Sequence, residues 1–323
     1  MELSWIQAAA FLLAAAAVVG NDSLQTLGTF LSSNRGRTPL AAQMAFLVGL
    51  TAVVLGVGWW LNGGDPAWGR LAQFPLPEAI GWIDLLPPLV VLLLTRWGAP
   101  VSTSVLLLTA IAPANAGPVL LRSLAGYGLA FASALLLYGA LLWLLERPLL
   151  DGQLSVDRGG AVDTPLWLVL QWLSTAWLWS QWLVHDLANI FVLLPRQLGA
   201  GQLGLSAAAL GAGLCALVAW GGGPIQQVVR GKVNTIHLRS ATLIDLLFGA
   251  LLLALARFSP TPLSTTWVFL GLLAGRELGL LLRLQHRPVA EVGAVLGRDL
   301  AKAALGLVVS LAVALLIQPF KGL

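Results

Sequence analysis

Long apolar stretches alternate with short polar ones along the chain. A helix needs about 20 predominantly apolar residues to cross a membrane. Eight stretches approach or exceed this length: residues 3–33, 41–62, 80–113, 118–145, 164–195, 203–220, 240–283 and 291–317. The pattern therefore predicts an all-α polytopic membrane protein.

Two polar stretches divide this pattern. Residues 146–163 form the only sizeable stretch typical of a soluble loop, and they lie near the middle of the chain. Residues 221–239 contain three consecutive glycines followed by several basic residues. The first stretch predicts two halves, residues 1–145 and 164–323, joined by a central loop.

The composition agrees with a lipid environment. Only 10% of the residues are charged and 58% are hydrophobic, whereas a soluble domain carries about 25% charged residues. The net charge is only +4 and basic runs are short, which argues against a nucleic-acid partner. A single cysteine, Cys215, excludes a disulfide framework and a thiolate metal site.

Four of the apolar stretches contain polar interruptions. The first holds Gly20-Asn21-Asp22 and the fifth holds His185-Asp186. The third and seventh each hold a proline with Ser and Thr. Ionisable residues within spans are costly and tend to be functional, and a broken helix is tolerated only where its freed backbone groups meet protein or water. We therefore expect broken helices at these places.

The two halves also repeat each other in sequence. Residues 83–104 read IDLLPPLVVLLLTRWGAPVSTS, and residues 244–266 read IDLLFGALLLALARFSPTPLSTT. In both copies an Asp lies 12 residues before an Arg, and a Pro-x-Ser-Thr-[Ser/Thr] turn follows. Matched polar residues at nearly fixed offsets are not expected by chance between Leu-rich segments, so they predict an internal structural repeat.

The basic residues test how the two copies are oriented. If 80–113 and 240–283 are re-entrant helical hairpins, each half has three crossings and the second half is inverted. With the N-terminus outside, the inner ends carry Arg35, Arg37, Arg147, Arg158, Arg230, Lys232, Arg239, Arg283 and Arg287. The outer ends carry Arg70, Arg122, Arg196 and Lys321. Because basic residues favour the inner side, this distribution supports an inverted repeat with both termini outside. Full crossing by each hairpin arm would instead allow a parallel repeat.

The repeated turns are candidate oxyanion sites. Pro suits the first position of a helix, and Ser and Thr cap free N–H groups or donate from their hydroxyls. Such a helix N-terminus binds oxyanions well, and two of them meeting from opposite sides would surround a tetrahedral anion. The simpler alternative is a structural cap in each copy. The candidate substrate ligands are Ser102, Thr103, Ser104, Ser264, Thr265 and Thr266.

Arg96 and Arg257 lie four and five residues before the prolines of the two turns. In a re-entrant hairpin they would lie deep in the membrane, where a guanidinium needs a partner. The fork geometry of Arg suits an oxyanion, so we expect both residues to contact the substrate. The alternative is a structural ion pair with Asp22 or Asp186.

The same two carboxylates are the clearest candidates for binding a coupling cation. Carboxylate, amide oxygens and unwound carbonyls form a hard oxygen site suited to Na⁺, which we expect at Asp22 and Asp186. His185 would make one site proton-linked, or it forms only a structural hydrogen bond. The candidate cation ligands are Asn21, Asp22, Gln25, His185, Asp186 and Asn189.

These motifs resemble those of the inorganic phosphate transporter (PiT) family. Of its signature Gly-Ala-Asn-Asp-x-x-Asn-x-x-Gly-Thr, the residues Asn21, Asp22, Gly28 and Thr29 match, and Gln25 replaces an Asn. In the second copy, His185 replaces an Asn before the matching Asp186 and Asn189. The family's Pro-Val-Ser-Thr-Thr-His turn occurs at 100–104 and 262–266, in both cases without its His. Asp84 and Asp245 stand where the family carries Glu.

The resemblance implies cation-coupled phosphate uptake through an inverted-repeat fold with two hairpins. The departures leave open the coupling ion, Na⁺ or H⁺, and the oxyanion. The alternatives are a transporter or channel for another small oxyanion such as sulfate, and a non-transporting membrane protein on the same scaffold. No catalytic constellation or nucleotide-binding motif occurs, so we expect neither an enzyme nor an organic cofactor. The expected location is the plasma (inner) membrane, and a homodimer is left open.

Overall fold

The computed structural model describes residues 4–74, 76, 80–97, 101–150, 165–222, 237–258, 261–285 and 288–320. Several parts of the sequence prediction lie outside these residues. They are Pro100 of the first turn, most of the central loop, residues 223–236 of the second polar stretch, and the basic residues Arg158, Arg230, Lys232, Arg287 and Lys321.

Every element in the described part of the chain is helical. The first half contains α1 (Trp5–Asn34), α2 (Leu40–Leu61), η1 (Trp82–Leu85), α3 (Leu86–Arg96), η2 (Ser104–Leu108), α4 (Thr109–Ile111), η3 (Pro113–Asn115), α5 (Ala116–Leu137), η4 (Tyr138–Leu142) and α6 (Trp143–Leu150). The second half contains α7 (Pro165–Phe191), α8 (Ala200–Ala219), α10 (Leu238–Phe258), α11 (Thr265–Leu284), α12 (Val289–Leu316) and η5 (Gln318–Phe320).

The helices give the chain the character of an integral, multi-pass membrane protein. Six helical segments are long and apolar enough to cross a membrane, by length and composition: Trp5–Ser23, Leu40–Leu61, Pro113–Arg147, Ala200–Ala219, Leu238–Phe258 and Val289–Phe320. Large apolar side chains on their outer faces are exposed, such as Leu121 at 71% and Leu205 at 75%. In a bilayer these faces contact lipid tails.

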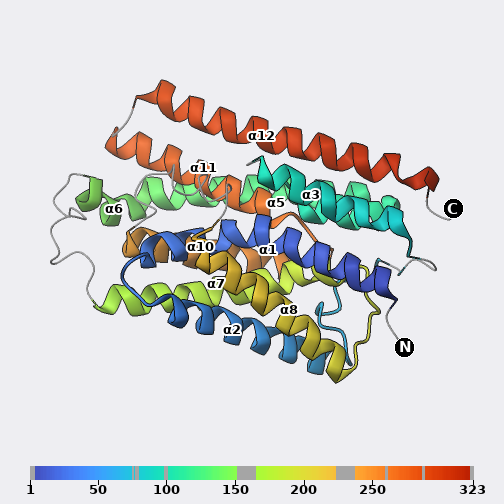
Figure 1. Ribbon diagram of the computed structural model, residues 1–323. Coiled ribbons are helices and arrows are strands. Elements are labelled where there is room, and N and C mark those ends of the chain that lie inside the picture. The colour runs from blue at the N-terminus through green and yellow to red at the C-terminus, as the bar shows by residue number, and fades with distance from the viewer. Residues whose placement is uncertain are drawn as a thin grey trace.

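Figure 1 shows the arrangement of these helices. α12 runs along one edge of the bundle and α2 along the opposite edge, with α1 and α10 between them. Both chain ends lie at the same end of the bundle, as expected for two termini on one side of the membrane. That the second half is inverted relative to the first remains a prediction.

The expected helix breaks at the two acidic residues were wrong. α1 passes without interruption through Gly20-Asn21-Asp22, and α7 passes through His185-Asp186. The interruptions occur at the Ser/Thr turns instead. α3 spans 11 residues, about 16 Å of helix, so it is too short to cross. α10 and α11 have 21 and 20 residues, so the second predicted hairpin has arms of full crossing length.

The second hairpin is held in place by close packing of α11 against α5. Gly271, Gly275 and Gly279 are spaced four residues apart on one face of α11. A Cβ at Gly271 would overlap the Tyr127 carbonyl oxygen, and one at Gly275 would overlap that of Phe131. Small residues at this spacing let two helix backbones approach closely within a membrane.

We expect Gly275→Ala to separate α5 from α11 and to destabilise the protein by about 1–3 kcal/mol, because the added methyl meets rigid backbone. The measurement is the melting temperature of the purified protein in detergent. Gly128→Ala is the matched control, since Gly128 lies on α5 with open space around it. A Gly275→Ala protein as stable as the Gly128→Ala protein would contradict this account of the packing.

Candidate functional site

The two Ser/Thr turns meet in the interior of the bundle. The Ser104 hydroxyl donates to the Leu263 carbonyl oxygen at 3.0 Å. The Thr266 hydroxyl donates to the Val101 carbonyl oxygen at 3.2 Å. These two hydrogen bonds join equivalent positions of the two copies, each turn donating to the other. The sequence repeat thus corresponds to a reciprocal contact between its copies.

In each turn, one residue caps a helix and the two following residues reach into the interior. The Ser102 hydroxyl accepts from the Val105 N–H at 3.1 Å, and the Ser264 hydroxyl accepts from the Trp267 N–H at 3.3 Å. The first Ser of each turn is therefore a helix cap, which is the simpler of the two roles considered from sequence. The two following residues of each turn extend toward the acidic residues of α1 and α7.

Asp22 connects both turns to α1. Its carboxylate accepts from the Thr103 hydroxyl, from the Thr266 hydroxyl at 3.0 Å, and from the Asn21 amide at 2.8 Å. The Asn21 amide also donates to the Val101 carbonyl oxygen at 2.7 Å. Asp22 is 1% exposed, so these donors replace the water that a carboxylate otherwise needs.

Asp186 and Asn189 occupy the position on α7 that corresponds to that of Asp22 on α1. The Asn189 amide lies 2.8 Å from Asp186 Oδ1, 2.9 Å from the Ser104 hydroxyl and 3.2 Å from the Thr103 hydroxyl. Thr265 lies beside the Asp186 carboxylate. Among the described residues, Asp186 Oδ2 and Asn189 Oδ1 are buried without a hydrogen-bond partner. The second copy therefore presents two unused acceptors where Asp22 has none.

Gln25 and His185, which differ from the family pattern, occupy different surroundings. Gln25 is buried, and its side-chain N–H group has no partner in the described part of the chain. His185 Nε2 lies 2.9 Å from the Leu252 carbonyl oxygen of α10. Since a carbonyl only accepts, Nε2 carries the proton in that contact and Nδ1 is left as an acceptor.

The structure does not bring Arg96 and Arg257 to this cluster. Both side chains are exposed at the ends of α3 and α10. Arg96 lines an apolar cavity of about 510 Å³ between α1, α3 and α8. Neither residue forms an ion pair with Asp22 or Asp186 in the described part of the chain. Because the last helical turn points them outward, the structure gives no contact among the described residues for either arginine at the Ser/Thr turns, and their depth in the membrane stays a prediction.

The other matched pair of acidic residues is divided between two roles. Asp84 accepts from the Gly81 N–H at 3.0 Å and caps η1. Asp245 is fully buried and accepts from Thr29 at 2.6 Å, from Thr175 at 2.8 Å and from Gln171 at 3.1 Å. Asp245 thus joins α10 to α1 and α7.

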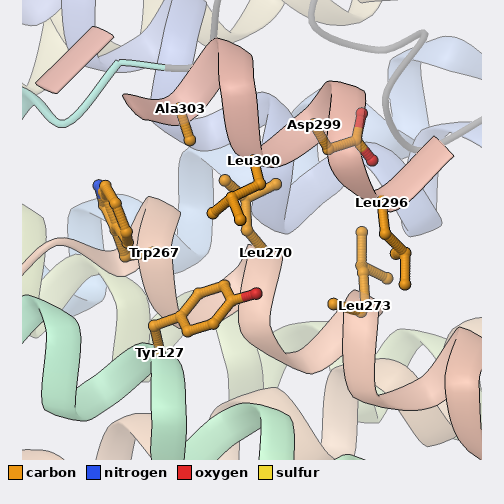
Figure 2. A pocket seen from close by; sticks show the side chains of 9 residues that line it. Tyr127, Trp267, Leu270, Leu273, Leu296, Asp299, Leu300 and Ala303 are labelled. Atoms are coloured by element: carbon orange, nitrogen blue, oxygen red, sulfur yellow. The ribbon is translucent and has the colours of Figure 1, made fainter. Parts of the chain in front are cut away.

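A small cavity behind the second turn is not part of the site. Figure 2 shows it between α11 and α12, with Tyr127 of α5 at its base. Its volume is about 20 Å³ and its lining is mostly apolar. Space of this size holds about one water molecule, which is too little for an oxyanion.

The comparisons with known proteins agree with this geometry at the level of the fold. No family model and no curated protein matches the chain. Among solved structures, the chain is similar to one described as the sodium-dependent phosphate transporter, with a TM-score of 0.61 and 14% identity. The match covers 98% of this chain and 99% of that chain. It confirms the expected all-α fold, which this chain shares with that protein.

Proposed function

We propose that this chain is a secondary transporter of inorganic phosphate. It would move phosphate across the plasma (inner) membrane by alternating access, in symport with Na⁺ or H⁺. The observation that carries the proposal is the meeting of residues 101–104 and 263–266 beside Asp22 and Asp186. The shared fold with a sodium-dependent phosphate transporter supports the same function.

The chemistry of the site explains why the anion would need a cation. The Thr103, Ser104, Thr265 and Thr266 hydroxyls suit phosphate oxygens, and two helix N-termini favour negative charge. Asp22 and Asp186 are close enough to repel each other electrostatically, and they would repel a bound anion as well. A Na⁺ ion or a proton on these carboxylates removes that repulsion, so anion and cation bind favourably together.

The unpaired oxygen acceptors of Asp186 and Asn189 favour a binding site for the coupling ion on α7. Asp186 Oδ2 and Asn189 Oδ1 are the kind of hard oxygen ligands that Na⁺ prefers. Asp22 would complete a second cation site only if Thr103 or Thr266 turned its hydroxyl away. A proton is the alternative ion, because His185 Nδ1 is an unpaired acceptor next to Asp186 in sequence. These groups fit either ion.

Substrate entry would require the two turns to separate. In the described structure their hydroxyls bond directly across the interface, and Thr103, Thr266 and Asn189 are 1% exposed or less. This arrangement is that of a closed site. Movement of one hairpin away from the other would expose the hydroxyls to one side of the membrane.

The direct test is uptake of labelled phosphate into proteoliposomes that contain the purified protein. An imposed Na⁺ gradient and an imposed H⁺ gradient identify the coupling ion. Unlabelled sulfate and other small oxyanions identify the preferred anion. Uptake of sulfate but not phosphate would assign a different oxyanion, and the absence of any uptake or binding would favour a non-transporting protein.

Thr266→Val tests whether the second turn contributes to binding. We expect the KM for phosphate to rise about 10- to 100-fold, because a hydrogen bond to a charged group is worth about 1.5–3 kcal/mol. Thr95→Val is the matched control, since among the described residues Thr95 bonds only the Val91 carbonyl oxygen of its own helix α3. Equal KM values for the two variants would remove Thr266 from the binding site.

A further inference from the structure

Residues 62–74, which follow α2, form a folded segment rather than an open loop. Asp65 accepts from the Ala67 N–H at 2.7 Å and from the Gly69 N–H at 2.9 Å. Gly69 has a φ of +71°, a conformation that glycine adopts without strain. This tight turn places Arg70 on the inner side of the segment, where only 6% of the residue is exposed.

The segment is fixed against the second half of the chain. The Phe74 carbonyl oxygen accepts from Arg196 Nη2 at 2.6 Å. The Leu198 N–H donates to the Gly64 carbonyl oxygen at 2.9 Å. The Thr261 hydroxyl, at the tip of the second hairpin, lies 3.4 Å from Gln73 Oε1. These contacts hold residues 64–74 beside the end of α7 and beside Thr261 of the second hairpin.

The charges that face Arg70 come from α5 and α7. Burial lowers the pKa of Arg70 to about 10, with the nearby Arg122 cation acting in the same direction and the Asp186 carboxylate opposing it. Arg70 thus stays charged at neutral pH. His185 lies within electrostatic range of both guanidinium groups. Two cations and one carboxylate leave an excess positive charge in a largely buried place.

The two arginines differ in what they bind. Arg122 is held by the carbonyl oxygens of Leu255 and Thr261, on either side of the hairpin tip. Arg70 Nη1 has no hydrogen-bond partner among the described residues, and Arg70 makes no direct ion pair with Asp186 there. A buried guanidinium nitrogen without a partner is costly, so the fold maintains a donor that another group can use.

We propose that Arg70 binds the oxyanion substrate at the mouth of the site, between residues 67–74 and the second hairpin, before it reaches the Ser/Thr turns. This inference rests on the proposed function. A guanidinium offers two parallel donors to one oxyanion, which fits phosphate or sulfate better than an ammonium does. The positive field of Arg122 would add attraction without occupying a ligand position.

The test is equilibrium binding of labelled phosphate to the full-length protein in detergent. We expect Arg70→Gln to raise the Kd about 10- to 100-fold and Arg70→Lys to raise it less. Arg35→Gln is the matched control, because Arg35 is exposed after the last turn of α1 and should leave the Kd unchanged. The melting temperature without phosphate should stay near that of the wild type in every variant.

The outcomes separate this inference from the proposed function. If the wild type binds phosphate and the Arg70 variants bind it equally well, Arg70 is not a substrate ligand. If Arg70→Gln melts much earlier while folded Arg70→Lys keeps the wild-type Kd, Arg70 is a structural residue and the inference fails. If the wild type binds sulfate instead, the same titration with sulfate decides the role of Arg70. If it binds neither anion, both proposals are wrong.

Discussion

Asp22→Asn should reduce phosphate uptake by about 100-fold or more while leaving the protein folded. The substitution keeps the size of the side chain but removes the charge that both turns share. Thr103 and Thr266 donate to this carboxylate, and hydrogen bonds to a charged acceptor are roughly twice as strong as neutral ones. Without the negative charge, the site also loses its attraction for a coupling cation.

The measurement is phosphate uptake into proteoliposomes, under whichever imposed gradient, Na⁺ or H⁺, drives more uptake by the wild type. Glu291→Gln is the matched control, because it makes the same carboxylate-to-amide change at an exposed position in the first turn of α12. Unchanged helical content and melting temperature would show that the loss concerns transport. Uptake by Asp22→Asn within about twofold of the wild type would remove Asp22 from the transport site.

Much of the fold followed from the spacing of apolar and polar residues. The lengths of the apolar stretches were enough to predict the long helices, because a helix needs about 20 apolar residues to cross the lipid. The sequence repeat identified the two Ser/Thr turns, and in the structure these turns are in contact. The sequence could also point to Asp22 and Asp186, since a carboxylate inside an apolar stretch needs a partner wherever it lies.

The helix breaks could not be predicted because they depend on tertiary partners. Asn and Asp are weak helix formers, so Gly20-Asn21-Asp22 indicates an interruption when taken alone. In the folded chain, Asn21 and Asp22 bond to residues 101, 103 and 266. Those contacts satisfy the side chains, and the backbone of α1 stays helical.

The positions of the arginines show a second limit of prediction from sequence. Successive residues of a helix point about 100° apart, so a side chain near a helix end faces the site or the lipid depending on one residue of register. In this structure the register turns the side chains of Arg96 and Arg257 away from the Ser/Thr turns. The sequence does not single out Arg70, because loop residues have no periodicity to interpret. The closest signal was Asp65 followed by Gly69, which indicates a structured turn.

A buried cluster of charged residues was also not predicted from the sequence. A substitution in this cluster should have a large effect on the stability of the protein. Arg276 of α11 is fully buried and bonds Glu146 of α6 at 2.9 Å and Glu277 at 3.1 Å. Its guanidinium lies 5.3 Å from the Tyr138 ring centre. The Ser240 hydroxyl of α10 donates to Glu146 at 2.7 Å. The cluster therefore ties both arms of the second hairpin to the end of the first half.

We expect Arg276→Gln to destabilise the protein by about 3–5 kcal/mol, because it leaves two buried carboxylates without their cation. The melting temperature in detergent measures this, with Arg298→Gln as the matched control at an exposed position of α12. Adding Glu146→Gln should recover part of the loss, since it removes one of the carboxylates that Arg276 neutralises and the two changes are coupled. An Arg276→Gln protein that melts with the control would mean that Glu146 and Glu277 are neutral or otherwise paired. The hairpin would then be positioned by its other contacts, among them the glycine face of α11.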